Sequence, residues 1–503
     1  MSVLIILALL SFILFAILDY GEKVRRLSGT PFTGPPFLPI VGHATGMIFK
    51  KPSQVFDLIQ QGVKEFGPLS RIYVVNLLFL SVTDPEYIEP ILSSQVHINK
   101  TVEYSYLKNW LGDGLLLTTG TKWHTRRKII SPAFHFKILE NFVSVFDKQA
   151  KIFVEKLKQF GPKTAVDVYP LVSLYTFDVI CETAMGTPVN SLLNENMEYV
   201  EGVKEITNIL HKRMYNALLR LDIFFKLSKS GAQERKAVKI LHKWTDRVIQ
   251  TRKKYLAEKK TPQIISEDDD IGQKNKMALL DILLQSQADN NSLSDEDIRE
   301  EVNTFMFAGH DTTTTAISFL LYNIARHPEV QEKIVEEIVS ILGTDTGGNL
   351  TRGELKSLTY LECVIKESLR LYAPVPMIGR YFPQETQLKN LRIPARSTVI
   401  IGAFCMGRDP KIFPDPETFK PERFFADVPR NPFSHIPFSA GPRNCVGQKF
   451  ALLEMKTSVV RLLQNFKLTV DPGYDKPQLE ATIVLRPLNG IVLNFEPRQS
   501  KQC

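Results

Sequence analysis

Apolar residues recur at helical spacing along most of the chain, but the first segment is apolar throughout. Ser2–Leu18 contains no charged side chain. These seventeen residues form a helix of about 26 Å, at the short end of what crosses a bilayer. Lys23, Arg25 and Arg26 follow, and positive charge on this side of the segment orients the rest of the chain into the cytosol. The pattern therefore predicts an uncleaved single-pass membrane anchor over residues 1–20.

A cleaved signal peptide is the alternative for this segment. Such a peptide has a basic region before its apolar run and a cleavage site with small residues at alternate positions. No Lys or Arg precedes the run, and Ala16–Asp19 is a poor cleavage site. The uncleaved anchor is therefore preferred.

The body that follows is predicted to be mainly α-helical with small β-sheets. Residues 21–45 are basic and proline-rich, which is typical of a stiff linker. Beyond them we find neither internal repeats nor a second linker, so we expect a single domain over residues 46–503. Long helices are predicted over 122–134, 144–160, 171–185, 199–226, 231–260, 294–327 and 448–463, and short strands over 69–82, 397–403 and 491–495.

Composition excludes several classes of protein. Hydrophobic residues make up 44% of the 503 residues and charged residues 23%, which are values of a globular protein rather than a disordered or polytopic one. The net charge of +8 is modest for this length, so we expect no nucleic-acid partner. The five cysteines lie far apart, which argues against a disulfide framework and favours a reducing compartment: Cys181, Cys363, Cys405, Cys445 and Cys503.

One of these cysteines lies in a sequence that suggests chemistry. Cys445 follows a turn-forming run and precedes a predicted apolar helix. Backbone amides at a helix N-terminus stabilise a thiolate. The flanking Gly441 and Gly447 allow the backbone to approach a flat, bulky group. A zinc site is disfavoured, because no second cysteine or histidine lies at the short spacing of zinc ligands.

The segment Phe438–Gly447 resembles the cysteine-ligand signature F-x-x-G-x-R-x-C-x-G of the cytochrome P-450 haem-thiolate monooxygenases. Further motifs of that family follow in the family's order, so the resemblance extends from the anchor to the C-terminus. It implies a mainly α-helical cytochrome P-450 fold with an N-terminal transmembrane helix. It also implies a non-covalent haem b, with the thiolate of Cys445 as the axial ligand of the iron.

The same resemblance assigns contacts to the haem. Trp123 and Arg127 match W-x-x-x-R, and at i, i+4 they share one helix face, which in the family points at a haem propionate. The other residues that the resemblance places against haem are Ala308, Arg380, His435, Phe438, Arg443 and Gly447.

Glu367 and Arg370 match the family's E-x-x-R motif. By itself such a pair is a common surface salt bridge, worth less than about 1 kcal/mol. In the family it is a buried network completed by the arginine that corresponds to Arg423 here. The resemblance therefore implies a structural role for these three residues, which is to hold the cysteine loop.

The predicted long helix contains Ala308–Thr313, which matches A-G-x-D-T-T. Gly309 and the threonines form helix poorly, and threonine hydroxyls compete for the i−4 carbonyls, so we expect a local distortion that admits O2 and water. The resemblance implies that Asp311 and Thr312 are the catalytic acid–alcohol pair that organises protons for cleavage of the O–O bond. Ala308 and Thr312 lie at i, i+4 and are expected to face the haem together.

Within the family, the chain is most similar to the insect-like microsomal members of family 4, the fatty-acid ω-hydroxylase branch. Many of these carry a glutamate where this chain has Ala308, and that glutamate can form an ester to the haem. Alanine cannot, so we expect no covalent attachment. The resemblance implies a monooxygenase that inserts one oxygen atom of O2 into a lipophilic substrate: a fatty acid, a lipid hormone or terpenoid, or a xenobiotic.

The resemblance also implies partners and a location. Electrons are expected from NADPH through NADPH–cytochrome P-450 reductase, with cytochrome b5 as a further donor, at the endoplasmic reticulum membrane and with the catalytic body in the cytosol. Lys122 and Arg126 are expected to face outward and help dock the reductase, with Lys449 and Lys456 extending their patch. The apolar segment Leu218–Leu227 is expected to form a second membrane contact.

Two other functions stay open at this point. One is a haem-thiolate isomerase or dehydratase that rearranges a peroxide without a reductase, and the other is a non-catalytic protein that binds haem or lipid. The presence of both Asp311 and Thr312 disfavours the first, and the intact cysteine loop disfavours the second.

Overall fold

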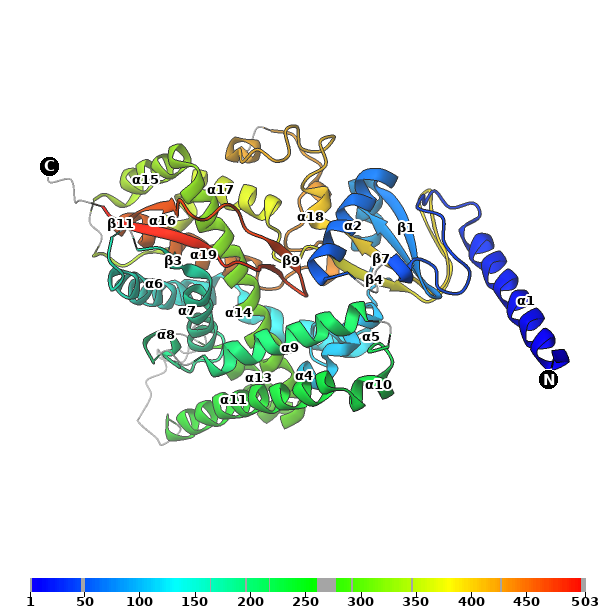
Figure 1. Ribbon diagram of the computed structural model, residues 1–503. Helices are drawn as coiled ribbons and strands as arrows, with labels where there is room; N and C mark the ends of the chain where they lie inside the picture. The colour runs from blue at the N-terminus through cyan, green and yellow to red at the C-terminus, as the bar shows by residue number, and fades with distance from the viewer. Residues whose placement is uncertain are drawn as a thin grey trace.

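The computed structural model describes residues 2–46, 50–162, 164–194, 197–216, 218–259, 277–290, 293–344, 347–425 and 428–498. Helices make up most of this structure, with small sheets among them (Figure 1). Helix α1 projects from the body next to the largest sheet (Figure 1).

The α-helices are α1 (Ser2–Leu27), α2 (Pro52–Phe66), α3 (Pro85–Ser93), α4 (Lys108–Leu111), α5 (Gly120–Ile130), α6 (Phe136–Lys158), α7 (Val168–Thr183), α8 (Ser191–Asn194), α9 (Glu198–Tyr215), α10 (Asp222–Leu227), α11 (Lys229–Lys259), α13 (Leu279–Asn290), α14 (Asp295–Arg326), α15 (Pro328–Leu342), α16 (Arg352–Ser357), α17 (Thr359–Leu371), α18 (Ala403–Met406) and α19 (Gln448–Asn465). Short 3-10 helices are η1 (Ala44–Gly46), η2 (Val102–Leu107), η3 (Ser131–Phe134), η4 (Pro421–Phe424), η5 (Pro432–Ser434) and η6 (Gly441–Arg443).

The strands are β1 (Leu69–Val74), β2 (Leu77–Val82), β3 (Val166–Asp167), β4 (Ile378–Phe382), β5 (Thr386–Leu388), β6 (Leu391–Ile393), β7 (Ser397–Ile401), β8 (Phe466–Val470), β9 (Leu479–Ala481), β10 (Leu485–Pro487) and β11 (Val492–Pro497). The largest sheet has the order β1-β2-β7-β4, in which β2 and β7 are parallel and the other pairs antiparallel. The strand predicted over 69–82 is a hairpin of two strands that turns at Val75, whose φ is 58°. These results confirm the mainly α fold class with small sheets.

Helix α14 crosses the middle of the body and packs against α7, α11, α17 and α19 (Figure 1). It begins as the sequence predicts: the hydroxyl of Ser294 accepts a hydrogen bond from the amide of Asp297, whose carboxylate bonds back to Ser294. A Cβ atom on Gly309 would lie 2.4 Å from Cδ1 of Ile180. Glycine at this position therefore lets α14 and α7 approach closely.

Not every predicted helix is continuous. The helix expected over 199–226 is two helices, α9 and α10, separated by a turn. The Asn216 side chain accepts hydrogen bonds from the amides of Leu218 and Leu219. Such an asparagine turn offers the backbone a partner other than the next helical carbonyl, which ends α9 there.

The N-terminal helix is longer than the predicted anchor, and its last turns pack on the body. It continues to Leu27, and Lys23 within it is almost fully buried, pairs with Asp19 at 2.8 Å and donates to the carbonyl of Ile40. Phe32 and Phe37 are buried in a core formed with the largest sheet. The residues expected to be a linker, 21–45, are therefore the end of α1 followed by a segment held against β1.

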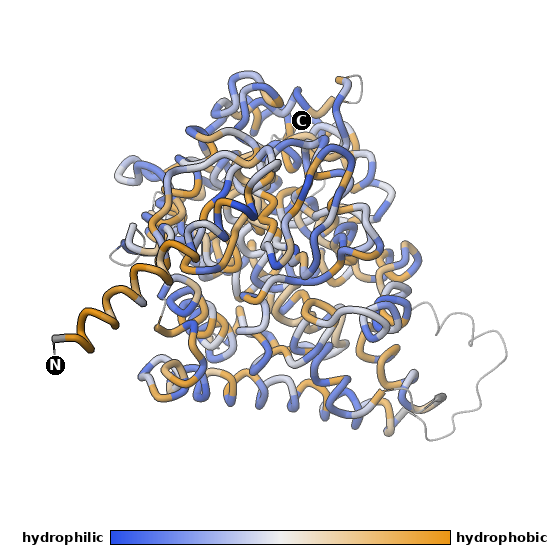
Figure 2. Tube along the Cα trace, turned by 90° about the vertical axis from the view of Figure 1, so that its right-hand side faces the viewer, coloured by the Kyte–Doolittle hydropathy of each residue, from blue (hydrophilic) through white to orange (hydrophobic). Residues whose placement is uncertain are grey.

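The earlier part of α1 remains apolar and exposed. Within the described residues, Val3–Leu27 is the only helix long and apolar enough to cross a membrane, and its apolar window is not covered by the body. Figure 2 shows it as a hydrophobic helix that extends away from the rest of the chain. These features agree with a membrane anchor.

A buried ion-pair network links α17 to the segment that leads to the cysteine loop. The Glu367 carboxylate accepts hydrogen bonds from Arg370 at 2.7 and 2.8 Å, and Arg423 lies 3.3 Å from it. Arg370 also donates to the carbonyls of Gly407 and Pro416. Glu367 and Arg370 have essentially no exposed side-chain surface. The predicted E-x-x-R residues and Arg423 thus come together as one buried cluster.

Glu367→Gln is expected to destabilise the protein by about 3–5 kcal/mol, because it leaves the Arg370 charge buried without a carboxylate. Thermal unfolding of the purified protein, followed by circular dichroism, measures the loss. Glu385→Gln is the matched control, since Glu385 pairs with Arg392 on the exposed β5–β6 hairpin. Equal stability losses for the two variants would contradict a structural role for the buried network.

Candidate active site

A large cavity lies between α14 and the loop that carries Cys445. Its volume is about 890 Å³, in the upper part of the range of about 300–1,000 Å³ that ligand pockets occupy. Phe305, Ala308 and Thr312 of α14 line one side, and Phe438 and Cys445 line the other. The lining also includes Trp123, Arg127, Arg443 and Gly447 among the predicted site residues.

Cys445 lies in a tight loop at the N-terminal end of α19. Its amide donates to the carbonyl of Phe438 at 2.9 Å, which closes the loop. Burial raises the pKa of the Cys445 thiol, while a hydrogen bond from the Gly447 backbone and the charge of Arg127 lower it. The exposed surface of Cys445 belongs to the cavity that this residue lines. The thiol is therefore presented to the cavity rather than to bulk solvent.

The glycine in the middle of the loop serves the protein and not a ligand. Gly441 has φ +68°, and a Cβ there would lie 1.9 Å from the carbonyl oxygen of Leu92 in α3. Only glycine fits so close to that backbone. The expectation that Gly441 makes room for a flat group is therefore wrong, whereas Gly447 does line the cavity.

Four cations gather beside the thiol without a carboxylate. Lys100, Arg127 and Arg443 line the cavity, and Arg380 is buried next to Lys100 and Arg443. Burial, and then repulsion from Arg380, lowers the pKa of Arg443 to about 9. The same two causes hold the pKa of Lys100 well below its usual range. In the part of the chain that the structure describes, none of the four forms an ion pair with an acidic side chain.

The cation cluster, defined as Lys100, Arg127, Arg380 and Arg443, therefore lacks an anion. A group that brings negative charge to this end of the cavity would favour the charged forms of these side chains and offset their mutual repulsion. Haem carries two propionate carboxylates and has a flat apolar ring, so the cations, the thiol and the apolar lining together fit it.

Two of these arginines tie the cysteine loop to the segments around it. Arg443 donates to the carbonyls of Ile98 and Leu115, at 3.3 and 3.0 Å, and to that of Thr118. Its guanidinium lies 4.7 Å from the centre of the Trp123 ring. Arg127 donates to the backbone and side-chain oxygens of Asn444, at 2.9 and 2.6 Å. The W-x-x-x-R pair and the cysteine loop are thus held as one unit.

His435 does not belong to this site, so its assignment as a haem contact is wrong. Its ring is absent from the cavity lining, packs 4.6 Å from the Phe424 ring and bonds through Nε2 to the carbonyl of Lys366. Burial lowers the pKa of His435 to about 3, so it is neutral. Because Lys366 directly precedes Glu367, this bond gives His435 a structural role beside the buried ion-pair network.

On α14, successive residues face different surroundings. The hydroxyl of Thr312 donates to the carbonyl of Ala308 at 2.8 Å, and both residues line the cavity, as the i, i+4 spacing predicts. Thr313 and Thr314 bond in the same way to Gly309 and His310. The hydroxyls do compete for i−4 carbonyls, but α14 runs without a break from Asp295 to Arg326. The expected distortion does not interrupt the helix.

Asp311 faces away from the cavity. Both its carboxylate oxygens accept hydrogen bonds from Nη2 of Arg486 in β10, at 2.9 and 3.0 Å. Asp311 is buried and does not line the cavity. The acid and the alcohol are adjacent in sequence but point to different neighbours.

Half of the basic patch predicted to dock a reductase is buried. Arg126 is almost fully buried and pairs with Asp297 of α14, and Lys122 lies 3.1 Å from Glu300. Lys456 is also buried, where it donates to the carbonyls of Leu355 and Leu358. The prediction that Arg126 and Lys456 face outward is therefore wrong, whereas Lys122 is partly exposed and Lys449 is exposed.

Sequence reasoning missed two residues of this site. Lys100 belongs to no motif, and it joins the cation cluster only because the fold brings the segment before η2 beside β4. Arg486 lies 175 residues from Asp311, so no local pattern connects them. The one signal in the sequence is that Arg486 follows the apolar residues Ile483–Leu485, where a buried arginine is costly without a partner.

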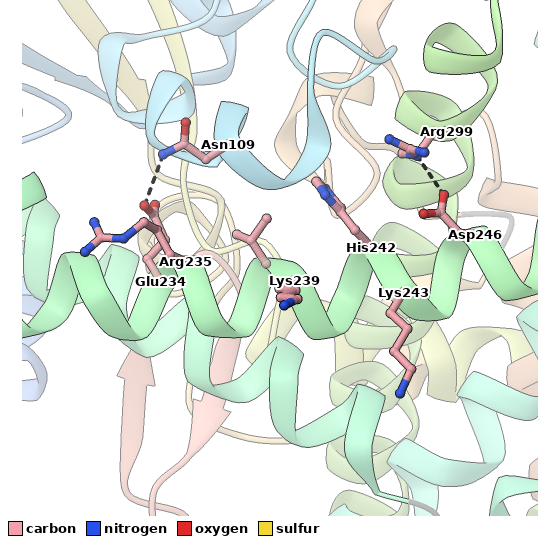
Figure 3. A pocket seen from close by; sticks show the side chains of 9 residues that line it. Asn109, Glu234, Arg235, Lys239, His242, Lys243, Asp246 and Arg299 are labelled. Carbon is pink, nitrogen blue, oxygen red and sulfur yellow. Dashed lines mark hydrogen bonds and ion pairs between the residues drawn. The ribbon is translucent and has the colours of Figure 1, made fainter.

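A second hollow is an open groove along α11, shown in Figure 3. Asn109 of α4 bonds to Glu234 at 3.0 Å, and Arg299 of α14 pairs with Asp246 at 2.7 Å across it. The rest of its lining is Arg235, Val238, Lys239, His242 and Lys243. This groove is polar, open to solvent and without a thiol, so it does not fit haem.

Known proteins resemble this chain over nearly its whole length. A family model described as Cytochrome P450 matches residues 32–494. Cytochrome P450 4d2 of Drosophila melanogaster is 47% identical over 481 residues, which cover 94% of this chain and 95% of that protein. Cytochrome P450 4d10 of Drosophila mettleri is 43% identical, over 92% of this chain and 91% of that protein. Since the family model spans the cavity and the cysteine loop, the chain belongs to the cytochrome P450 family and is a P450 monooxygenase.

Proposed function

We propose that this P450 is a microsomal enzyme that inserts one oxygen atom of O2 into a lipophilic substrate with electrons from NADPH. The balanced reaction is R–H + O2 + NADPH + H⁺ → R–OH + NADP⁺ + H2O. The observation that carries the proposal is the cavity that Cys445, Thr312 and three members of the cation cluster line together: Lys100, Arg127 and Arg443. Both electrons come from NADPH through a reductase, and the second oxygen atom leaves as water.

Haem b is the proposed cofactor, held without a covalent link. Cys445 would supply the axial thiolate, and the cation cluster with Trp123 would hold the propionates. Phe438 and Gly447 would contact the ring from the cysteine side and Ala308 from the α14 side. When bound, haem supplies the iron at which O2 is activated, with the thiolate donating electron density. Ala308 has no carboxyl group with which to form an ester.

The apolar lining supports a lipophilic substrate. Beyond the cysteine loop, the cavity is lined by Leu107, Leu210, Phe305, Val375 and Ile483. Burial of such side chains against a substrate contributes roughly 25 cal/mol per Å² of apolar surface. Fatty acids, lipid hormones or terpenoids, and xenobiotics all belong to this class.

Thr312 and Asp311 are proposed to handle protons. The Thr312 hydroxyl lines the cavity and holds its own position through the Ala308 carbonyl. Asp311 is the nearest acid along α14 and is linked to Thr312 through the backbone. Their joint presence favours the reductase-dependent reaction over a reductase-independent isomerase or dehydratase.

The proposed location is the endoplasmic reticulum membrane, with the body in the cytosol and residues 46–503 as one catalytic domain. Helix α1 would anchor the chain. Five apolar side chains around α10 are at least half exposed, which supports a second membrane contact rather than a place in the core: Leu218, Leu221, Ile223, Phe224 and Leu227. NADPH–cytochrome P-450 reductase is the proposed electron donor, with cytochrome b5 as a further one and the exposed Lys449 in its docking surface.

Cys445→Ala is expected to abolish the red-shifted ferrous–CO band and all NADPH-driven turnover, because no other thiol lines the described cavity. The CO difference spectrum of the purified variant measures this. Cys405→Ala, which changes a cysteine outside the cavity lining, is the matched control. A normal band in Cys445→Ala would rule out this ligand.

Thr312→Ala is expected to keep haem but to uncouple the enzyme, so that more peroxide is released and less product is formed for each NADPH consumed. The reason is the loss of the hydroxyl that lines the cavity. Thr314→Ala is the control, because the Thr314 hydroxyl bonds to Thr176 on α7 and not to the cavity. Unchanged coupling in Thr312→Ala would place the proton path elsewhere.

Deletion of residues 2–18 is expected to release the protein from membranes only in part. This cut keeps the contacts of Asp19 and Lys23 with the body, and the exposed residues of α10 still bind lipid. Ile223→Ser with Phe224→Ser in the truncated protein should complete the release, as measured by sedimentation of membranes. Val339→Ser, at another exposed apolar residue, should not. Full solubility of the truncated protein alone would exclude the second contact.

A further inference from the structure

The β9–β10 hairpin touches both the cavity and the proton-handling acid. Its tip, Thr482–Val484, lines the cavity. Its second strand carries Arg486, which holds Asp311. A hairpin with only three residues in each strand has little room to absorb a displacement of its tip. The cavity lining and the ion pair are therefore joined by one short hairpin.

The Arg486–Asp311 pair is incomplete. One nitrogen of Arg486 serves both carboxylate oxygens, instead of the two parallel bonds that a guanidinium forms with a carboxylate at best. The Nε atom of Arg486 is buried and has no hydrogen-bond partner among the described residues. Arg486 thus has a donor to offer to a second acceptor.

That second acceptor lies directly across the hairpin. Glu480 of β9 is paired in register with Arg486, and residues directly opposite each other in an antiparallel pair have Cβ atoms about 4.5–5.5 Å apart. The closest basic group to the Glu480 carboxylate is Nδ1 of His211, at 3.8 Å. Burial, and then the charge of Arg486, lowers the pKa of His211 to about 4. His211 is therefore neutral near pH 7, and Arg486 is the charged group that acts on the half-buried Glu480 carboxylate, whose pKa burial raises and Arg486 lowers.

We propose that the β9–β10 hairpin is a substrate-responsive switch in which Arg486 is a positioning residue shared between Asp311 and Glu480. With no substrate against the hairpin tip, Arg486 holds the Asp311 carboxylate away from the cavity. A substrate that displaces the tip moves Arg486 toward Glu480. Asp311 is then free to take up a proton from solvent, one of those that the reaction consumes, and to pass it toward Thr312.

The consequence is that proton delivery follows occupancy of the cavity. While both oxygens of Asp311 bond to Arg486, the carboxylate is held away from the cavity that Thr312 lines. The reaction takes up protons as O2 is reduced, so an acid that is released only by substrate limits the reduction of O2 to peroxide when the cavity is empty. The inference rests on the proposed monooxygenase function and adds a control element to it.

Ligand affinity tests the switch without reference to turnover. The two probes are 1-dodecylimidazole, whose alkyl chain fills the cavity, and imidazole, which ligates the iron but is too small to reach the tip. Spectral titration of the full-length holoenzyme gives both dissociation constants. A ligand shifts a two-state equilibrium only through its different affinities for the two states, so weakening either state must change the affinity of the larger ligand alone.

The two variants should act in opposite directions. Glu480→Gln removes the alternative partner and should weaken 1-dodecylimidazole binding about fivefold or more, the lower end of such couplings. Asp311→Asn weakens the resting pair and should tighten the same binding. Imidazole affinity should stay unchanged in both variants, and Glu385→Gln should affect neither ligand. Shifts in the same direction, equal shifts for both ligands, or no shift would each overturn the switch.

A second measurement separates the switch from the function on which it rests. Glu480→Gln should retain the red-shifted ferrous–CO band, yet release more peroxide per NADPH, and Glu480→Asp should restore part of the coupling because it keeps the charge. Loss of the band in the wild-type protein would instead contradict the haem-thiolate assignment. Wild-type coupling in Glu480→Gln, with the band intact, would contradict the switch alone.

Discussion

The structure depends on a group of positive charges that the chain does not neutralise. Lys100, Arg127, Arg380 and Arg443 lie together at the end of the cavity that Cys445 lines. Burial, and then repulsion from Arg380, lowers the pKa of Arg443 to about 9. A buried charge is costly unless it is paired. One end of the cavity therefore has an excess of positive charge. A flat ligand that carries two negative charges and binds a thiolate is suited to neutralise it.

The same charges hold the loop that presents the thiol. Arg443 is fastened to three backbone carbonyls, so it cannot swing away from the cavity. Arg127 is bonded to Asn444, which directly precedes Cys445. Behind them, the buried Glu367–Arg370 pair fixes the segment that enters the loop. Arg443 and Arg127 therefore serve the ligand site and hold the cysteine loop, so a change at either arginine disturbs both.

Three successive residues of helix α14 contact three different parts of the structure. His310 bonds to Ser173 of α7 at 2.7 Å, Asp311 bonds to Arg486 of β10, and Thr312 faces the cavity. Successive residues of a helix are turned by about 100°, which follows from 3.6 residues per turn. This geometry separates the acid from the alcohol and leaves room for a partner that controls when the two act together.

Local motifs predicted much of this arrangement. The cysteine loop, the E-x-x-R network and the shared face of Ala308 and Thr312 all depend on residues close in sequence, and each has the expected geometry. What a motif could not give was the direction of a charged side chain toward a distant element. Arg126 turns inward because Asp297 of α14 lies beside it, and Asp311 turns to Arg486 because β10 packs there. His435 lies near the loop in sequence but bonds to α17.

We infer that the cavity binds haem, with the Cys445 thiolate as the ligand of the iron and the cation cluster beside the propionates. The most direct test is the haem content of the purified full-length protein, together with its ferrous–CO spectrum. We predict one haem per chain, released intact by acidic solvent because it is not covalently attached, and a red-shifted band typical of thiolate ligation. Protein that folds without haem, or a band at the position typical of imidazole ligation, would contradict the account.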